Sequence, residues 1–321
     1  RISFEGNERT HDVVLRREMR QMEKSWVSNN LLETSKLRLD RLGFFKSVKY
    51  EKNAVPGSTD EVDVIFKVEE QFSGSIGGSL GYGAYGFSLG ANYSEKNAFG
   101  TGNSINVGIT YSEWRQDISF NFFDPYFTID GIGLGYGAFI RKTDYGNFNL
   151  AAYNTDSYGG SVSFDLPISE IEQVGLSLSY DKTDLKTNLY SSRQLLDFYN
   201  SEGFDFTTYN ASVSWRRITL DRGLFPTRGT SNGISLSFSL PGSNLNFGRL
   251  THEFKYFQPL PRGLIFGYRS KIGYLFTYGD TESAPPYQYF YAGGMRSVRG
   301  FKQNYLGPKA VYQSGLSLIH I

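Results

Sequence analysis

Histidine and cysteine are the side chains that most often carry acid–base chemistry or bind transition metals, and this chain offers few of them. His11, His252 and His320 lie far apart, and none forms the His-Glu-x-x-His spacing that places two zinc ligands on one helix face. Cysteine is absent, so neither a disulfide framework nor a thiolate metal site is available. The sequence therefore predicts no catalytic centre, no metal site and no cofactor site. We expect that the protein is not an enzyme.

One glycine motif could in principle bind a phosphate group. Gly81-Tyr82-Gly83-Ala84-Tyr85-Gly86 matches the Gly-x-Gly-x-x-Gly pattern of dinucleotide-binding loops. Such a loop must open a helix, whose N-terminus then faces the phosphates. Here a second alternating, strand-like segment follows the motif. We therefore interpret it as a tight turn between two strands.

Composition narrows the class of protein further. Lys+Arg is 33 and Asp+Glu is 32, a near-balance that removes any electrostatic case for a nucleic-acid partner. Gly 36, Tyr 23 and Phe 26, with 20% charged residues, favour many β-strands over helices. No stretch approaches the roughly 20 apolar residues of a membrane helix.

The first part of the chain, residues 1–70, is predicted to be a mixed domain of order β-α-α-β-β. Residues 1–5 alternate like a strand. Leu15, Met19 and Met22 form an apolar helix stripe after a possible N-cap at Thr10. A second helix is expected from about Ser28 to Leu42, ending at Gly43. The segments around 48–50 and 62–68 then form a hairpin across Pro56-Gly57.

From Phe72 onward the hydrophobic period is two, which predicts an antiparallel all-β region over residues 71–321. We count about eleven strands, at 74–82, 86–94, 105–111, 116–123, 132–141, 162–166, 174–180, 206–216, 234–240, 247–257 and 264–278, with a twelfth beginning near Lys309. A soluble sandwich would alternate in the same way.

Two features favour a transmembrane β-barrel in the lipid bilayer over the sandwich. The weaker face of the strands is rich in Ser, Gly, Asn and Thr, where a soluble sheet carries Lys and Glu. The connections at 95–103, 124–131, 167–173 and 258–263 are short (217–230 is longer), whereas 142–156, 183–205 and 279–309 are long. Short turns on one rim and long loops on the other are typical of membrane barrels.

The segment 285–308, within the expected long loop 279–309, stands out by its residue types. It contains four glycines and several aromatic residues, together with Val298, Arg299, Gly300 and Phe301. Exposed loops seldom contain so many aromatic side chains. We therefore expect that this segment folds back and packs, and that an arginine there needs carboxylate partners.

At this loop the sequence resembles the BamA family of outer-membrane protein assembly factors of Gram-negative bacteria. The resemblance is carried by Ala292-Gly293-Gly294, by Val298-Arg299-Gly300-Phe301 and by Gly307-Pro308-Lys309-Ala310-Val311-Tyr312. Asp124–Gly131 and the segments Asp221-Arg222-Gly223 and Phe225-Pro226-Thr227 resemble its periplasmic turns. Residues 1–70, with Arg16–Glu23 and Leu42-Gly43-Phe44-Phe45, resemble its barrel-proximal POTRA domain.

The resemblance implies a protein that folds and inserts unfolded β-barrel proteins into the bacterial outer membrane, with its N-terminal domain in the periplasm. A substrate strand would add to the free edge of the first barrel strand by backbone hydrogen bonding. The residues implied for this seam strand are Ser75, Ile76, Gly77, Gly78, Ser79, Leu80 and Gly81. Their glycines would leave the backbone accessible; alternatively, they would only permit strong curvature.

Two further roles follow from the resemblance. Arg16, Arg20 and Glu23, expected to be exposed on the first helix, would dock a periplasmic-face lipoprotein of the assembly complex; alternatively, they form a solvated charged face. Arg299 would point into the barrel lumen towards carboxylates on later strands. A POTRA-containing secretion transporter is the alternative function, because it shares the domain and a related loop motif.

The resemblance also predicts an incomplete barrel. The family has sixteen strands, so about four would follow those predicted here. The last six residues, 316–321, resemble the translation of a sequencing adapter. We expect them to be artificial.

Overall fold

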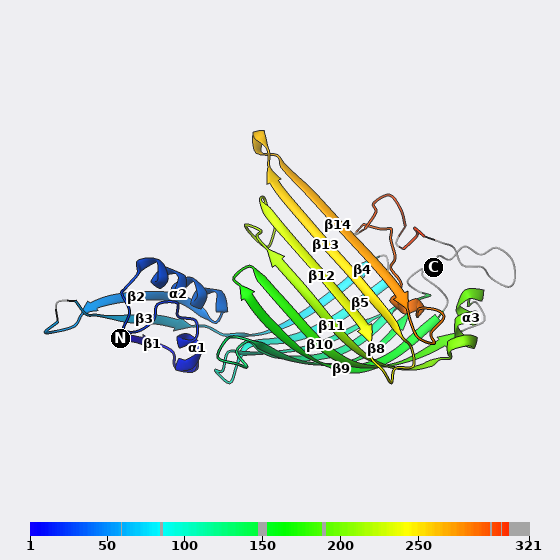
Figure 1. Ribbon diagram of the computed structural model, residues 1–321, viewed down its shortest axis with the longest axis horizontal. Coiled ribbons are helices and arrows are strands. Elements are labelled where there is room, and N and C mark those ends of the chain that lie inside the picture. The colour runs from blue at the N-terminus through cyan, green and yellow to red at the C-terminus, as the bar shows by residue number, and fades with distance from the viewer. Residues whose placement is uncertain are drawn as a thin grey trace.

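The computed structural model describes residues 1–58, 60–83, 86–146, 153–187, 191–295, 297–302 and 304–307. The chain forms a small α+β unit followed by one large curved sheet (Figure 1). The N-terminal unit contains β1 (Ile2–Glu5), α1 (Asp12–Arg16), α2 (Asn29–Leu42), β2 (Phe45–Ala54) and β3 (Val62–Glu70). Its sheet order is β1-β3-β2, with β1 parallel and β2 antiparallel to β3. The predicted order β-α-α-β-β is therefore confirmed.

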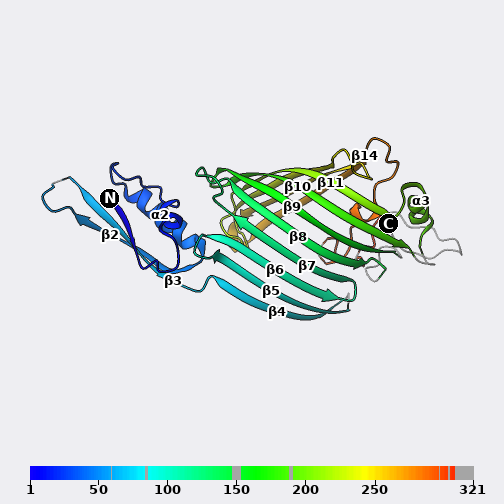
Figure 2. The same ribbon diagram turned by 90° about the horizontal axis from the view of Figure 1, so that it is seen from below.

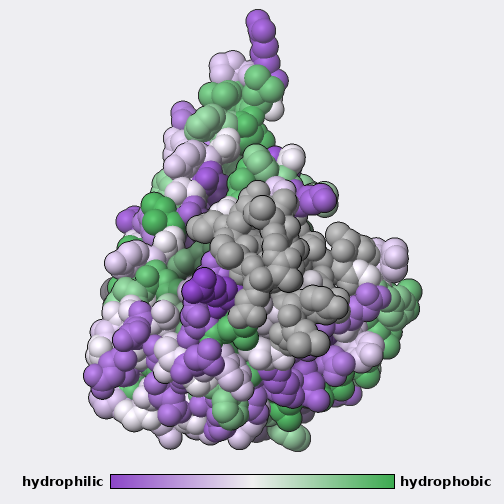
Figure 3. Space-filling view, turned by 90° about the vertical axis from the view of Figure 1, so that its right-hand side faces the viewer, coloured by the Kyte–Doolittle hydropathy of each residue, from purple (hydrophilic) through white to green (hydrophobic). Residues whose placement is uncertain are grey.

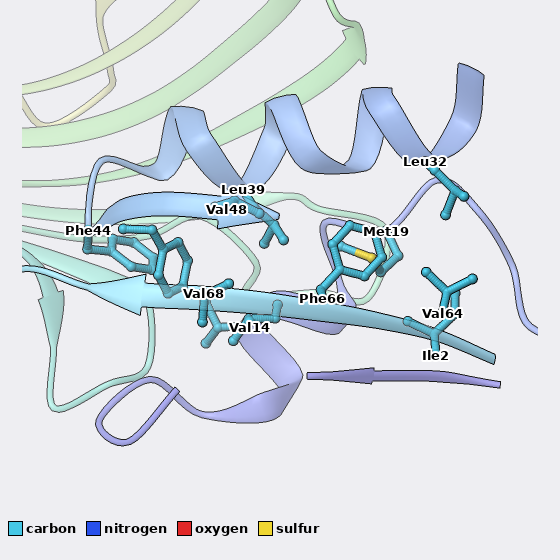
Figure 4. Packing of buried hydrophobic residues seen from close by; sticks show 12 residues of the cluster. Ile2, Val14, Met19, Leu32, Leu39, Phe44, Val48, Val64, Phe66 and Val68 are labelled. Atoms are coloured by element: carbon cyan, nitrogen blue, oxygen red, sulfur yellow. The ribbon is translucent and has the colours of Figure 1, made fainter. Parts of the chain in front are cut away.

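Helix α2 begins and ends where the sequence predicts. Ser28 is its N-cap residue, and Gly43 at its C-terminus has φ 79, a left-handed conformation that glycine adopts without steric cost. The helix packs on the sheet through Leu32 and Leu39, which are fully buried. Figure 4 shows these side chains facing Val48, Val64 and Phe66 of the sheet. This cluster is a compact apolar core of its own.

The first helix is much shorter than predicted. It ends at Arg16, because Glu18 and Met19 make tighter backbone hydrogen bonds to residues three positions earlier. The backbone N–H groups of Arg20 and Gln21 then donate to the Ser35 hydroxyl, at 2.8 and 3.4 Å. If α1 were longer, these two N–H groups would donate to carbonyl groups of the same helix. Here they donate to a side chain of α2 instead. As a result Met22 leaves the predicted apolar stripe and is exposed, whereas Leu15 and Met19 are buried.

The second part of the chain is a single antiparallel sheet of eleven strands. Its strands follow the chain order from β4 to β14, so each strand pairs with its sequence neighbours (Figure 2). They are β4 (Gly74–Gly83), β5 (Gly86–Ala98), β6 (Asn103–Ser112), β7 (Arg115–Asp124), β8 (Gly133–Asp144), β9 (Tyr153–Ser169), β10 (Glu172–Thr187), β11 (Asp205–Ile218), β12 (Gly229–Ser239), β13 (Phe247–Pro259) and β14 (Ile265–Thr277). Among the described residues β4 and β14 are its two edges, so the sheet is an open part of a barrel.

The two faces of this sheet differ sharply in chemistry. One row of paired residues crosses seven strands and is apolar throughout: Leu134, Phe164, Leu176, Val213, Leu236, Leu250 and Tyr274. The row one residue further along faces the other side and consists of Gly135, Ser163, Ser177, Ser212, Ser237, Arg249 and Leu275. We call these the apolar face and the polar face.

The apolar face is not covered by a second sheet. Phe164 is 39% exposed and Val162 is 36% exposed, and both would be buried in a soluble sandwich. Viewed from the end that carries α3 (Arg193–Glu202), hydrophobic groups are exposed along parts of the outline, interspersed with hydrophilic residues (Figure 3). An uncovered apolar face of this extent is a lipid-facing surface.

The loop lengths differ from the prediction on one rim. Strands β9 and β10 are longer than expected, so the connection predicted at 142–156 is only 145–152. The connection predicted at 183–205 shrinks to 188–204 and contains α3. The sequence pattern did not indicate these strand ends, because polar residues interrupt the alternation there, among them Asn154, Thr155 and Asp184. The predicted twelfth strand and the segment 316–321 lie outside the described residues.

The glycine motif at 81–86 forms a turn between strands. Gly83 ends β4 and pairs with Gly86, which begins β5 with φ 77. No helix follows the motif, so it cannot present a helix N-terminus to a phosphate. Among the described residues no helix has the length and apolar character needed to cross a membrane.

Candidate functional site

The first barrel strand, β4, contains the residues expected at the seam. It pairs only with β5 among the described residues, so one row of its backbone N–H and C=O groups faces away from the sheet. Ile76 and Leu80 are 86% and 75% exposed on the apolar face, whereas Ser75, Gly77, Ser79 and Gly81 lie on the polar face. The strand is therefore an open edge whose two faces match those of the sheet.

The backbone conformation of β4 does not require its glycines. Gly74, Gly77, Gly78 and Gly81 all lie outside the left-handed region that only glycine adopts easily. A methyl group on Gly78 would lie 4.0 Å from the nearest atom, the carbonyl oxygen of Gly90, which is an ordinary contact. Neither strain nor crowding therefore requires glycine at position 78.

The Val298–Phe301 motif lies in a loop that closes on itself. Ala292 and Leu306 form an isolated antiparallel bridge, and the Leu306 N–H donates to the Ala292 carbonyl at 3.0 Å. Gly293 has φ 111, and a Cβ there would lie 2.5 Å from the Lys302 carbonyl oxygen. The two ends of the loop thus meet at a narrow neck, which we define as the Ala292–Leu306 pair.

All four motif residues are exposed at the far end of this loop. Among the described residues Arg299 makes no hydrogen bond or ion pair. Its expected carboxylate partners would lie on later strands, so its place in the lumen stays a prediction. Sequence reasoning did locate the segment that folds back. Before the neck, Tyr287, Tyr289 and Tyr291 are partly buried, and Phe290 is 36% exposed.

Two of those tyrosines lie at a second apolar core at the α3 end of the sheet. Tyr287, which is partly buried, packs against Tyr153, Phe206 and α3 in this cluster, and the Tyr291 side chain lies beside that of Tyr153. The Tyr145 and Tyr153 rings stack at 4.4 Å. Burial raises the pKa of Tyr287 and of Tyr291, so both phenols stay neutral near pH 7. The structure therefore confirms that the loop packs, through side chains that the motif itself does not include.

Arg16, Arg20 and Glu23 are exposed, as expected, but they do not share one helix. Only Arg16 lies in α1; Arg20 and Glu23 lie in the irregular segment after it. Glu23 accepts a hydrogen bond from the Ile2 N–H at 2.7 Å and lies 3.6 Å from Arg16. That backbone hydrogen bond, with Arg16 and the N-terminus nearby, lowers the pKa of Glu23 although burial opposes it. Arg20 instead pairs with Glu170 of the sheet.

A polar junction, which sequence reasoning missed, joins the N-terminal unit to the sheet. Arg38 of α2 lies at its centre and is 16% exposed. It donates to Glu18 at 2.7 Å, to Glu170 at 2.6 Å and to the Tyr126 hydroxyl at 3.0 Å. Burial acts to lower the pKa of Arg38, but these neighbours outweigh it and raise the pKa. The guanidinium of Arg17 stacks on the Tyr126 ring at 4.5 Å.

A second contact holds the turn between β5 and β6 against the N-terminal unit. The His11 N–H donates to the Gly100 carbonyl at 2.9 Å, and the Asn97 amide donates to the Thr10 hydroxyl at 2.8 Å. A Cβ on Gly100 would lie 2.0 Å from the Arg9 carbonyl oxygen, so only glycine permits this approach. Three turns, at 99–102, 125–132 and 170–171, therefore dock on the N-terminal unit.

Between the unit and the sheet lies a cavity of 1210 Å³. Arg16, Arg20 and Arg38 line it from one side, and Tyr126 and Glu170 from the other. Within the described residues, no group of three or more histidine, cysteine or acidic side chains could hold a metal ion. The lining of this cavity is thus rich in charged side chains from both regions.

An α+β unit docked on an open antiparallel sheet with an uncovered apolar face defines a protein of the outer-membrane β-barrel class. The chain belongs to the Omp85 superfamily: the model of the Omp85 superfamily domain matches residues 97–319, and the POTRA model, described as a surface antigen variable number repeat, matches residues 1–71.

Its relatives include the outer membrane protein assembly factor BamA of Neisseria meningitidis, with 32% identity over 98% of this chain and 41% of the relative. BamA of Nitratidesulfovibrio vulgaris is 28% identical over 96% of this chain and 38% of the relative. The crystal structure of BamA from Haemophilus ducreyi lacking POTRA domains 1–3 superposes with a TM-score of 0.82 at 32% identity, covering 97% of this chain and 61% of that one. The chain thus spans about two fifths of the length of the two BamA sequences and 61% of the Haemophilus ducreyi chain, which itself lacks three POTRA domains.

Proposed function

We propose that this chain is part of a factor that folds and inserts β-barrel proteins into the bacterial outer membrane. Residues 1–70 form its barrel-proximal periplasmic domain, and residues 71–321 belong to its barrel. The observation that carries the proposal is the 32% identity to a BamA assembly factor over 98% of this chain, and the strand that we assign to the seam is β4, at one edge of the described sheet. Incoming strands of unfolded outer-membrane proteins pair with this edge and are templated by it.

The chemistry of β4 supports this role. An unfolded strand in a bilayer must satisfy every backbone N–H and C=O group, because lipid offers no partners. The free row of β4 provides a ladder of such partners at the point where the apolar face begins. Its small residues, Gly77 and Gly78, leave that ladder accessible to an incoming chain.

Disulfide cross-linking in the full-length protein tests the templating. Cysteines at Ser75 and Ser79 should capture cysteines placed along the last strand of a stalled substrate barrel, with one fixed register for each pair. Cysteines at Ser163 and Ser177, which lie on paired inner strands, are the control and should capture none. Equal capture at both places, or capture without register, would sink the seam mechanism.

A secretion transporter with POTRA domains is the second candidate. CdiB from Acinetobacter baumannii shares the fold, with a TM-score of 0.57 at 15% identity. Sequence identity favours the assembly factor. Depletion of the full-length protein separates the two: an assembly factor should lower the amounts of many unrelated barrel proteins. A transporter should affect one exported cargo and leave the others at normal levels.

The exposed charges near α1 are proposed to dock a lipoprotein partner at the periplasmic face. Trp26, which lies three residues after Glu23 in the chain, is 92% exposed and adds apolar area to this unit. Glu23→Lys in the full-length protein should reduce co-purification of that partner. Because Glu23 also binds the Ile2 N–H, Glu23→Gln is the control that keeps an acceptor and removes only the charge.

Glu23→Gln should weaken the docking less than Glu23→Lys. Normal co-purification with both variants would leave a solvated charged face as the better interpretation. Arg20 is a poor test of docking, because its guanidinium is 3.1 Å from Glu170 and its loss would also disturb the junction.

Arg299 is proposed to hold the motif loop inside the intact barrel by pairing with carboxylates. A guanidinium forms a planar, bidentate pair that lysine cannot reproduce. Arg299→Ala should slow barrel assembly, because loss of a charge-assisted hydrogen bond costs about 1.5–3 kcal/mol. Lys302→Ala, in the same loop and also exposed, is the control. Normal outer-membrane protein levels with Arg299→Ala would contradict this role.

A further inference from the structure

A contact outside the motif fixes the base of the motif loop. The Arg249 guanidinium lies 4.4 Å from the centre of the Phe290 ring. Arg249 belongs to β13, on the polar face, and its Nε is buried without a hydrogen-bond partner among the described residues. The aromatic ring therefore takes the place of a hydrogen-bond acceptor for this cation.

Gly273 on the neighbouring strand β14 makes room for the same ring. A Cβ at Gly273 would lie 2.5 Å from two carbon atoms of Phe290, closer than real contacts allow. The backbone of Gly273 is not left-handed, so its conformation does not require glycine. What requires glycine is the ring that lies on it. Arg249 and Gly273 together form a seat for Phe290.

The seat lies just before the neck of the motif loop. Phe290 precedes Ala292 by two residues, and the neighbouring Tyr291 hydroxyl donates to the Pro286 carbonyl at 2.9 Å. Tyr287 and Tyr291 pack towards β9, whereas Phe290 packs on β13 and β14. The stem of the loop is thus attached at two places on the polar face, near β9 and at β13–β14, and these attachments set the position of the motif beyond the neck.

We propose that Phe290 is the anchor of the motif loop, and that Arg249 and Gly273 are positioning residues which act through it on Val298–Phe301. The assignment of a role to the motif rests on the proposed assembly function. The position of the loop does not, and it can be measured separately. Loss of the seat should open the neck without unfolding the sheet.

Limited trypsin digestion of the full-length protein in outer-membrane vesicles reports this opening. Arg299 and Lys302 are exposed cleavage sites inside the closed loop. Gly273→Ala should speed cleavage at both sites about fivefold, which corresponds to about 1 kcal/mol in the opening equilibrium. Gly233→Ala is the control, because its Cβ would lie 4.0 Å from the nearest atom, and it should change nothing.

A double-mutant cycle separates positioning from a general weakening of β14. Phe290→Ala should speed cleavage by a similar factor, and Gly273→Ala should add nothing in that background, because the ring it displaces is gone. Phe290→Tyr keeps an aromatic ring, and trypsin should cleave this variant as slowly as the unsubstituted protein. An unchanged cleavage rate for Gly273→Ala would overturn the proposal. So would an equal effect of Gly273→Ala with and without Phe290. Neither result would bear on assembly activity, which is scored by outer-membrane protein levels.

Arg249 is tested in the same assay. Arg249→Gln removes the cation and keeps a polar side chain, and it should release Phe290 and speed cleavage about threefold to tenfold. Arg249→Lys keeps the charge but loses the planar stack, and an intermediate rate is expected. Equal protection in all three proteins would show that Phe290 is held by Gly273 alone and would remove Arg249 from the proposal.

Discussion

Strand β3 of the N-terminal unit and strand β9 of the large sheet show the same alternation but opposite burial. In β3 the apolar residues Val64, Phe66 and Val68 are buried, and Phe66 is fully buried beneath α2. In β9 the corresponding residues Val162 and Phe164 are more than a third exposed. Alternation therefore specifies two different faces, but it does not specify whether protein or lipid covers the apolar one.

Whether protein or lipid covers an apolar side chain decides how much its removal lowers the free energy of unfolding. The largest effect is expected in the N-terminal core. Phe66→Ala should destabilise that unit by about 3–5 kcal/mol, because the cavity under α2 cannot collapse. Phe164→Ala should cost less, because mobile lipid chains fill the space. Urea-dependent protease resistance of each region in membrane-embedded protein measures both. Equal losses would contradict the difference in covering.

A charge placed on the sheet sharpens the comparison between its two faces. Val162→Arg should destabilise the folded protein by about 2–4 kcal/mol, because it puts a guanidinium in hydrocarbon. Ser163→Arg, one residue further on, faces the polar side and should have a much smaller effect. The folded fraction after extraction, read from heat-dependent gel mobility, distinguishes them. Similar fractions would mean that the faces are wrongly assigned.

The junction joins the two regions, and loss of its central residue, Arg38, is expected to have a comparably large effect on stability. Arg38→Ala removes the contacts to Glu170 and Tyr126 across the junction and also leaves Glu18, which is 5% exposed, without its cationic partner, so it should cost about 3–5 kcal/mol and loosen the docking. Arg20→Ala, at an exposed pair, should cost less than about 1 kcal/mol. Hydrogen exchange in turns 125–132 and 170–171 reports the loosening. A larger effect of Arg20→Ala would contradict this ranking.

The smallest expected effect is a dependence of the docking on pH. Burial raises the pKa of Glu170, but hydrogen bonds and charge from Arg20 and Arg38 outweigh it and lower the pKa. The stabilisation is therefore present above the ordinary glutamate pKa of about 4.3. It is lost as the pH falls through the lowered value. Energy transfer between dyes on the two regions should fall in that range, and Glu170→Gln should remove the dependence. An unchanged pH profile for Glu170→Gln would assign the effect to another group.

The sequence predicted the large sheet well, because period-two patterning is a local signal. All eleven strands were expected near the positions where they occur, although the ends of β9 and β10 and the start of β12 were missed. The helix α1 was predicted too long, because the competing acceptor, Ser35, lies on another helix. Apolar spacing cannot reveal such a competitor.

The site was only partly predictable, and for the same physical reason. The packed loop was predicted from its glycines and aromatic residues, whereas the seam residues, taken from the family resemblance, stay a prediction. The junction was not, because Arg38 meets Glu170 across 132 residues of chain. The seat of Phe290 was also missed. Gly273 resembles any other glycine in a strand until the ring that covers it is known.

The docking of three turns on the N-terminal unit determines which barrel strands are mechanically coupled to that unit. The covalent link at 71–73 is a short tether, whereas the turns at 99–102, 125–132 and 170–171 form a broad base under strands β5 to β10. We therefore expect that a rotation of the N-terminal unit would move those strands. Among the described residues, the edge strand β4 connects to the N-terminal unit only through this link and through its pairing with β5. The domain is thus attached to the barrel wall along β5 to β10 rather than along the edge strand.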